Sequence, residues 1–403
     1  RIPSLFRRCH PGICDQLNDN RANPGELTMS TYIDIHIIQN LPPSCVNRDD
    51  SGSPKSAVYG GVRRLRVSSQ SWKRATRLYF NDLLDADDVG VRTKRVVEVL
   101  AAAIAKDAPE LAENATTLAE GVFKAAKIKL SPPRGKKDGT QESGYLLFLS
   151  TSQITRLAEL AVTSVRDGEA LDAKAVKKIF KEAHAVDIAL FGRMVADDTD
   201  LNVDAACQVA HAISTHAAEN EYDFFTAVDD EKNRSEEEDA GAGMMGTVEF
   251  SSATMYRYAT VNLDMLAENL GDGEAALRAL EVFIRGFCLS MPTGKQNTFA
   301  NRTLPETIVI SIRDDQPISL VGAFEKPGPE ASGTGYVDRS VGALAQYTET
   351  IEKNYGVTPL SSFVVALKDS DAVSSFGERV PFADLPGRVR QVVDPRVGRE
   401  ERV

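Results

Sequence analysis

The sequence predicts an α+β protein in which one sheet-bearing domain is interrupted by a long helical insertion. Strand-like segments stand near both ends of the chain, at "TYIDIHIIQN" (31–40), "ETIVISIRD" (306–314) and "SSFVVALKD" (361–369). Between about 90 and 205 the chain is instead rich in alanine and amphipathic at helical spacing. The predicted order is β-β-α, the helical insertion, β-α-β and a final strand.

The first strand-like segment alternates apolar and polar side chains. Three isoleucines at 33, 35 and 37 alternate with Tyr32, Asp34 and His36, which predicts a half-buried strand that Pro42 and Pro43 end. The other elements that we expect are a strand at 62–68, a helix at about 70–84, helices around 94–105 and 172–185, a strand at 253–263 and a helix at about 274–289.

Several segments lack a packing face. Residues 1–28 are turn-rich without any sustained period, and we expect an extension, disordered or derived from the expression vector, outside the fold. The polar end of the chain, 391–403, is expected to be a flexible tail. Residues 129–144 predict a mobile loop, and 231–243 ("EKNRSEEEDAGAG") are acidic and of low complexity.

Composition excludes several classes of protein. A hydrophobic content of 42% and a charged content of 26% are ordinary for a folded soluble protein, and no apolar run is long enough to span a bilayer, so we expect a cytoplasmic protein without membrane contact. Five cysteines without a CxxC pair support neither a zinc site nor a disulfide framework. The net charge of −11 argues against indiscriminate coating of nucleic acid but allows one local basic groove.

The stretch "GGVRRLRVSSQSWKRATR", 60–77, concentrates positive charge without one acid. In a strand, Arg64 and Arg66 would leave the sheet on the side away from Leu65. In the following helix one face would carry Gln70, Lys73, Arg74 and Arg77, and the opposite, apolar stripe Trp72, Ala75, Thr76, Tyr79 and Leu83. Ser68 and Ser69 stand where an N-cap belongs, so the stretch predicts a surface that tracks phosphates. The alternative is a solvated basic face that pairs with acids elsewhere.

A second basic helix is predicted at "LDAKAVKKIFKEAH", 171–184. Its lysine rail consists of Lys174, Lys177, Lys178 and Lys181, and the opposite face of Val176, Ile179, Phe180 and Ala183. Such a rail suits the backbone of a nucleic-acid duplex, although exposed helix lysines are also routine on ordinary proteins.

Catalytic signatures are weak. "PTGKQ" at 292–296 lacks the upstream glycine and the Ser/Thr of a P-loop, and His211 and His216 do not form a metal motif. Pairs of aspartates such as Asp49 and Asp50 are common in loops and have no supporting His or Lys constellation. We therefore expect a protein that is not an enzyme and has no cofactor or metal.

Seven segments together resemble the backbone subunits of the type I-E CRISPR surveillance complex Cascade, the CasC family of the RAMP superfamily. They are "PSCVNRDD", "GGVRRLRVSSQSWKRATR", "DIALFGRM", "AHAISTH", "DFFTAVDD", "GTVEFSSATMYRYATVNL" and "KQNTFANR", in the family's order. The resemblance runs from Met29 to about residue 390.

The resemblance implies an RRM-like (ferredoxin-like) palm with a helical finger insertion and a thumb hairpin. The palm would comprise 29–88, 206–218 and 251–390, the fingers 89–205 and the thumb 219–250. About six copies would polymerise along the spacer of the CRISPR RNA (crRNA) and present the guide in short segments to target DNA. Further implied partners are the large and small Cascade subunits, the subunits that bind or process the crRNA 5′ and 3′ ends, and a helicase-nuclease recruited later.

The resemblance also implies residue roles. The RNA backbone would be held by Asn47, Arg48, Lys55, Ser68, Gln70, Lys73, Arg74, Arg77, Lys295 and Gln296. A wedge that displaces a guide nucleotide would use Met194, Phe225 and Thr226, with Phe224 in the core, and the lysine rail would contact target duplex DNA. The acidic segment 231–243 lengthens the thumb beyond the family pattern.

Two other functions remain open from the sequence. One is a metal-dependent RNase, as in the related type III backbone subunits, with Asp50 as base or ligand. The other is a protein–protein adaptor that uses the acidic segment and binds no RNA.

Overall fold

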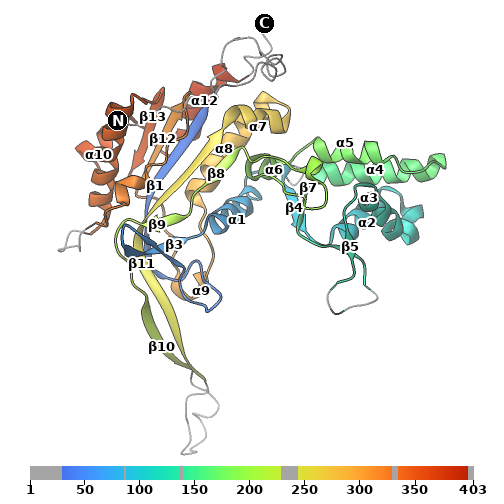
Figure 1. The fold of residues 1–403 in the computed structure, drawn as a ribbon, viewed down its shortest axis with the longest axis horizontal. Helices are drawn as coiled ribbons and strands as arrows, with labels where there is room; N and C mark the ends of the chain where they lie inside the picture. Colours follow the sequence, from blue (N-terminus) through green and yellow to red (C-terminus); the bar gives the residue numbers. More distant parts are fainter. Residues whose placement is uncertain are drawn as a thin grey trace, which may run out of the picture.

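The structure is a computed structural model that describes residues 30–85, 88–133, 135, 139–227, 244–328 and 335–397. The expectations for residues 1–28 and for the acidic segment 231–243 lie outside these ranges. A body built on one large sheet, a lobe beside it and a projecting two-stranded arm make up the molecule (Figure 1).

The body contains a ten-stranded sheet with the order β14-β13-β12-β1-β11-β9-β3-β2, and β8 and β10 also pair with β11. The strands are β1 (Tyr32–Ser44), β2 (Ser56–Tyr59), β3 (Val62–Val67), β8 (Cys207–Val209), β9 (Ala212–Ser214), β10 (Glu221–Ala227), β11 (Met244–Asn262), β12 (Thr307–Arg313), β13 (Ser361–Ala366) and β14 (Glu378–Arg379). The strands expected at 62–68, 253–263, 306–314 and 361–369 are thus present, which confirms a mixed α+β fold.

The predicted strand is present as β1, but it is buried on both faces, so the expectation that it is half-buried is wrong. β1 pairs antiparallel with β11 on one side and with β12 on the other, and every residue from Ile33 to Gln39 is buried. The polar side chains Asp34 and His36 are covered because a second layer of helices packs on their face of the sheet. The alternation of apolar and polar residues therefore reflects two buried faces of β1 that differ in polarity, and not one buried face and one exposed face.

Helices cover both faces of the sheet. The isoleucine face packs against α1 (Ser69–Phe80), α7 (Leu263–Leu270), α8 (Gly273–Leu289) and α12 (Leu385–Val393). The other face packs against α10 (Val337–Tyr355), α11 (Asp371–Ser374) and the 3-10 turn η6 (Val321–Phe324). The helices expected at about 70–84 and 274–289 correspond to α1 and α8, whereas α10 and α12 were not expected.

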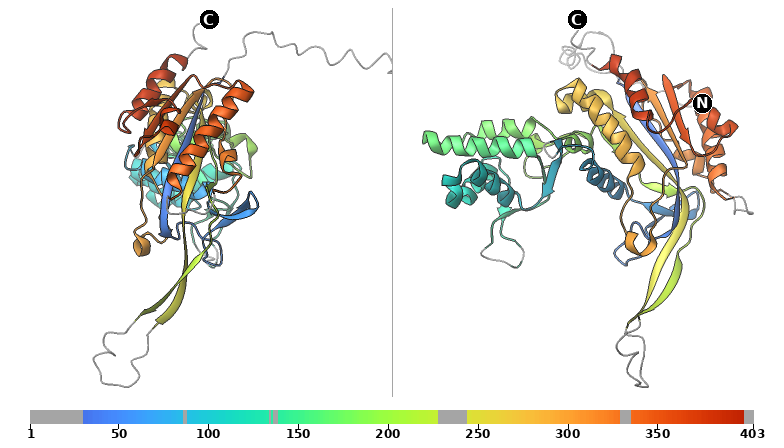
Figure 2. Two further views of the ribbon diagram at one scale, coloured as in Figure 1. Left: turned by 90° about the vertical axis from the view of Figure 1, so that its left-hand side faces the viewer. Right: turned by 180° about the vertical axis from the view of Figure 1, so that it is seen from behind.

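The predicted helical insertion forms the lobe beside the body (Figure 2). Its elements are β4 (Gly90–Thr93), α2 (Val96–Asp107), η3 (Pro109–Asn114), α3 (Ala115–Ala125), β5 (Leu130–Ser131), β6 (Glu142–Ser143), β7 (Leu147–Ser150), α4 (Thr151–Asp167), α5 (Ala173–Lys181), α6 (Val186–Phe191) and η4 (Thr199–Leu201). The lobe has its own core, in which Leu100, Phe123 and Phe180 are buried. β4 and α6 lie where the lobe joins the body (Figure 1).

The arm is an antiparallel pair of β10 with the first part of β11, in register from Glu221↔Phe250 to Ala227↔Met244. It projects away from the body, and its side chains stay exposed or half-buried because no helix covers it (Figure 1). β11 continues from the arm into the centre of the sheet, so arm and sheet share one strand.

Residues 391–397 contradict the expectation of a flexible tail from 391, because most of them are helical. α12 continues to Val393, whose side chain is fully buried, and the 3-10 turn η7 (Asp394–Arg396) follows. Apolar residues of α12 reach the sheet core, which explains why the helix persists. Among the described residues, none of the helices combines the length and apolarity needed to cross a bilayer.

Candidate nucleic-acid interface

The junction between β3 and α1 is a capped helix start. The Ser68 hydroxyl accepts a hydrogen bond from the Ser71 backbone N–H at 3.3 Å, which confirms the predicted N-cap. Asn47 Oδ1 in turn accepts from the Ser68 backbone N–H at 2.8 Å, so the two residues are fixed to each other. Ser68 is 6% exposed, and its hydroxyl is therefore engaged in the helix rather than free on the surface.

The loop after β1 lies along this junction. The Lys55 N–H donates to the Asn47 carbonyl and the Arg66 N–H donates to the Lys55 carbonyl, both at 2.9 Å. These bonds hold Asn47, Lys55 and Arg66 beside the start of α1. Arg48, one residue further, is exposed.

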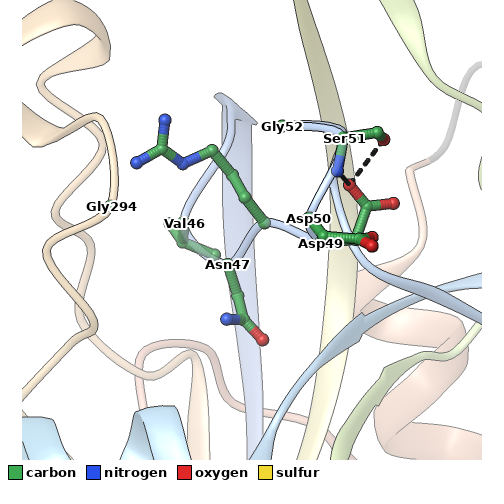
Figure 3. Close-up of a pocket in the computed structure, with 8 residues that line it drawn as sticks. Val46, Asn47, Asp49, Asp50, Ser51, Gly52 and Gly294 are labelled. Carbon is green, nitrogen blue, oxygen red and sulfur yellow. Dashed lines mark hydrogen bonds between the residues drawn. The ribbon is translucent and has the colours of Figure 1, made fainter.

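The loop between α8 and β12 approaches from the other side. Gly294 lies against this segment so closely that a Cβ at Gly294 would stand 2.3 Å from the Val46 carbonyl oxygen. Figure 3 shows Gly294 across a shallow pocket from Asn47 and Asp49. Lys295, with φ of 52°, turns the chain into the short helix α9 (Gln296–Phe299), and Gln296 is exposed. The structure thus brings the three predicted basic segments to one place.

The exposed part of α1 carries two cations, Lys73 and Arg74, that make no ion pair with a described residue. Gln70 and Arg74 are exposed and Lys73 is half-buried, with its Nζ 5.6 Å from the centre of the Phe191 ring. We define the basic surface as the residues of these segments that keep accessible side chains: Asn47, Arg48, Lys55, Arg66, Gln70, Lys73, Arg74, Lys295 and Gln296.

His211 borders the basic surface, where the sequence did not lead us to expect it. Its Nδ1 accepts from the Ser69 backbone N–H at 2.9 Å, next to the helix cap. Partial burial lowers the pKa of His211, and the cations of Arg66 and Lys55 lower it further. A neutral His211 therefore completes the capped junction, which no spacing in the sequence indicated.

Arg64 corrects the strand argument, because it is fully buried. Its guanidinium donates to the backbone carbonyls of Ser214 at 2.8 Å, Phe324 at 2.8 Å and Tyr59 at 3.1 Å. Arg64 therefore ties β3 to β9 and to η6, and the expectation that it faces a phosphate is wrong. Burial of its face by η6 explains the error.

Arg77 is also committed to the protein. Its Nε donates to Asp187 Oδ2 at 3.1 Å, and its guanidinium lies 4.5 Å from the centre of the Phe148 ring. Asp187 is fully buried and also accepts from the Gly90 N–H at 3.0 Å. Arg77 thus connects α1 to three elements of the lobe, and the expectation of a free phosphate-binding side chain does not hold for it.

Met194 stands out from the lobe with 80% of its surface exposed. The adjacent Arg193 is 4% exposed and donates to the carbonyls of Phe180 at 2.6 Å and Leu201 at 3.0 Å. Backbone hydrogen bonds in both directions between Arg193 and Val203 close the loop. A rigid loop therefore presents Met194 to the outside.

The arm strand β10 and helix α6, which ends three residues before Met194, are well apart in Figures 1 and 2. Phe224 is 64% exposed, so its assignment to the core is wrong. Phe225 is half-buried because its ring lies over Gly246 of the paired strand, where a Cβ would come within 2.7 Å. Thr226 is exposed.

The lysine rail is partly neutralised. Val176, Ile179 and Phe180 are buried as predicted, but α5 ends at Lys181 and Ala183 lies beyond it with φ of 52°. Lys177 forms an ion pair with Asp198, and Lys178 lies 3.9 Å from Glu182. Lys174 and Lys181 are exposed and make no ion pair with any residue that the structure describes.

Comparisons with known proteins identify the family. Residues 33–385 match the Cas_CT1975 family, described as CT1975-like protein. The chain belongs to this family. No curated protein matches this CT1975-like protein. A solved chain of a "CRISPR RNA-guided surveillance complex, pre-nicking" is 36% identical, with a TM-score of 0.79 over 90% of this chain and 99% of that one. A chain of a "CRISPR RNA-guided surveillance complex" is 31% identical, with a TM-score of 0.71 over the same shares.

The CT1975-like chain places Asp49 and Asp50 at the tip of the loop in Figure 3, in different roles. Asp49 Oδ1 accepts from the Ser51 hydroxyl at 2.7 Å and from the Ser53 N–H at 3.0 Å, and these bonds lower the pKa of Asp49. Asp50 is exposed. Within the described ranges, no cluster of three His, Cys, Asp or Glu side chains could hold a metal ion.

Proposed function

We propose that this CT1975-like protein is a subunit of a CRISPR RNA-guided surveillance complex and binds the guide RNA along its backbone. The two solved relatives are chains of complexes described in this way, and each is matched over 99% of its length. The observation that carries the RNA-binding role is the basic surface, where the neighbouring segments 47–55 and 60–77 and the distant segment 294–296 meet at the capped start of α1.

The chemistry of the basic surface favours the RNA backbone over base sequence. Arginine and lysine side chains at a helix N-terminus pair with phosphates, which carry no sequence information. A subunit that must accept any guide needs this kind of contact. The acidic remainder of the chain, with a net charge of −11, would confine the RNA to this surface.

The more specific assignment is a backbone subunit of the type I-E kind, in which about six copies polymerise on one crRNA. The order β12-β1-β11-β8 with α1 and α8 on one face supports an RRM-like palm, and the lobe and arm would be fingers and thumb. Since Met194 and the arm lie apart in one chain, a common wedge would combine the lobe of one copy with the arm of another. The other Cascade subunits, target DNA and the helicase-nuclease would be its further partners.

The protein would act as a scaffold without catalysis. The alternative with a specific observation is the metal-dependent RNase, because exposed Asp50 lines the pocket beside the basic surface. Under the scaffold proposal, Asp50→Ala leaves crRNA length and yield unchanged, and wild-type protein does not cleave complementary RNA with Mg²⁺. A Mg²⁺-dependent cleavage that Asp50→Ala abolishes would establish the RNase instead.

Co-expression with a CRISPR array and the other complex subunits tests the proposal. The purified protein should carry RNA, seen as excess absorbance at 260 nm and as guide-length RNA on a denaturing gel. Replacing Lys73 and Arg74 by glutamate should remove that RNA. Protein that assembles with its partners yet carries no RNA would support the adaptor function and overturn the proposal.

A further inference from the structure

A second cavity opens beside the basic surface. It lies between the C-terminal half of α1 and the loop that joins α8 to β12, with a volume of about 220 Å³. The lining residues are Ala75, Leu78, Tyr79, Asp82, Ser290, Met291, Pro292, Thr293, Gln296, Asn301 and Arg302. This volume is below the range of pockets for drug-sized ligands, so it suits one flat ring system or one side chain.

Asn301 gives the cavity an unsatisfied polar group. Its side chain is 2% exposed, and its amide nitrogen is buried without an acceptor among the residues that the structure describes. An unpaired buried donor costs free energy, and native proteins keep few of them. An acceptor from a bound molecule would remove this cost.

Other polar side chains of the lining also lack a hydrogen-bond partner among the described residues. Tyr79, Asp82 and Gln296 make no side-chain hydrogen bond or ion pair with residues in the described ranges. By contrast, Ser290 Oγ lies 3.4 Å from Thr76 Oγ1, and Met291 Sδ accepts from the Thr303 N–H at 3.2 Å. Of these four unpaired lining groups the Asn301 amide is buried, whereas Tyr79 is half-buried and Asp82 and Gln296 are exposed.

The lining favours a heterocycle over a hydrocarbon. Leu78 and Pro292 supply apolar walls and the Tyr79 ring can stack on a planar partner. An apolar side chain from a second copy, such as exposed Phe224, would fill the space but leave Asn301 unpaired. A nucleobase offers both a flat face for the walls and acceptors at its edge for the amide.

The position of the cavity indicates the source of that base. Leu78 follows Arg74 by four residues on α1, so the cavity and the exposed cation are neighbours on one helix surface. Gln296 lines the cavity and also belongs to the basic surface. We propose that this cavity binds one base of the single-stranded RNA whose backbone lies on Lys73 and Arg74.

This inference rests on the proposed RNA-binding function. It goes beyond backbone contact, because it assigns a base-binding site in the body of each subunit. Asparagine and glutamine amides offer a donor and an acceptor each, so the site can take different bases. One stacked and hydrogen-bonded base would fix the register of the RNA without reading its sequence.

The free protein provides the first test. Asn301→Leu should raise the urea midpoint, because it removes an unpaired buried donor. Asn269→Leu is the matched contrast: its amide nitrogen donates to the Ala189 carbonyl at 3.0 Å and the Asp204 carbonyl at 2.9 Å, so its replacement should lower the midpoint. A lowered midpoint for Asn301→Leu would mean that the amide is already satisfied and would overturn the proposal.

The second test uses a short RNA in which an abasic nucleotide is placed at each position in turn. Wild-type protein should lose about five-fold in affinity at one position, the worth of a single base contact. Asn301→Leu should show that loss on intact RNA and no added loss with the abasic nucleotide. Gln346→Leu, an exposed amide on α10, should bind like wild type.

The outcomes of these experiments distinguish failure of the cavity proposal from failure of the proposed RNA-binding function. If wild-type protein binds no RNA, the proposed function and this inference both fail. If it binds RNA and the abasic dependence survives in Asn301→Leu, only the cavity proposal fails. A change in the oligomeric state of RNA-free Asn301→Leu would show that a second copy fills the cavity and would also overturn it. Tyr79→Leu and Gln296→Ala repeat the RNA experiment should Asn301→Leu not fold.

Discussion

Arg77 and Asp187 join the body to the lobe through a contact of 3.1 Å between Nε and Oδ2. Asp187 is fully buried, and burial raises the pKa of its carboxyl while the Arg77 guanidinium lowers it. The same carboxylate accepts from the Gly90 N–H where the chain enters the lobe. One ion pair therefore holds both connecting segments, β4 and α6, against α1.

We expect Arg77→Ala to destabilise the protein by about 3 kcal/mol, since it leaves a buried carboxylate without its partner. The free energy of unfolding in urea measures this effect, and small-angle scattering should show a wider spread of lobe positions. The double variant Arg77→Met with Asp187→Leu should recover most of the stability. If Arg77→Ala is as stable as wild type and loses only RNA affinity, Arg77 binds RNA and does not act as a structural residue.

Lys73 and Arg74 should carry the salt-dependent part of RNA binding. Replacing both by alanine should lower affinity equally for unrelated RNA sequences, and the slope of log K against log salt should fall by about 1.4. Lys353→Ala, an exposed lysine on α10, is the control and should leave the slope unchanged. Loss confined to particular sequences would contradict backbone contact.

For the basic surface, the sequence predicted the secondary-structure elements better than it predicted which of their side chains are exposed. The helix start at Ser68 and the apolar stripe containing Trp72 were predictable because capping and period are local properties. The burial of Arg64 and the pairing of Arg77 depend on η6 and Asp187, which lie more than one hundred residues away. The charge of the stretch 60–77 could not distinguish buried or paired arginines from exposed ones, because both kinds contribute equally to its positive charge.

The exposed apolar side chains should unstack RNA. With 2-aminopurine in a bound guide, Met194→Ala should reduce the fluorescence of unstacked positions while RNA affinity changes little. On the arm, Phe224→Ala should have a larger effect than Phe225→Ala, because Phe224 is 64% exposed and Phe225 packs on Gly246. Val165→Ala, an exposed apolar residue of α4, is the control. If none of these variants changes the fluorescence, these side chains do not displace a guide nucleotide.

The lysine rail should divide into two functions. Replacing Lys174 and Lys181 by alanine should weaken binding of duplex DNA to the assembled complex and leave assembly intact, because neither pairs with a described residue. Lys177→Ala should instead lower the stability of the lobe modestly, since it removes the ion pair to Asp198. Filter binding of duplex DNA and thermal unfolding distinguish the two. A loss of duplex binding in Lys177→Ala as large as that from replacing Lys174 and Lys181 would mean that the ion pair with Asp198 opens so that Lys177 reaches DNA.

His36 should contribute a loss of stability as the pH falls. It is fully buried between Tyr256, whose hydroxyl lies 2.9 Å from Nδ1, and Tyr258, and burial together with Arg313 lowers the pKa of His36 to about 3. Below about pH 6.5 the unfolded chain therefore binds a proton that the folded protein does not, and stability is lost as the pH falls toward 3. Between pH 7 and pH 5 this loss amounts to about 2 kcal/mol.

The neighbouring Asp34 works in the opposite direction. Burial raises the pKa of Asp34 to about 6, so the folded protein binds a proton more readily than the unfolded chain and gains stability as the pH falls from about 6 to 4. Urea unfolding of wild type alone would therefore show a shallow pH dependence. The difference in stability between wild type and His36→Gln isolates the histidine and should shift by about 2 kcal/mol against wild type from pH 7 to pH 5. A difference that stays constant over this range would show that His36 titrates alike in both states.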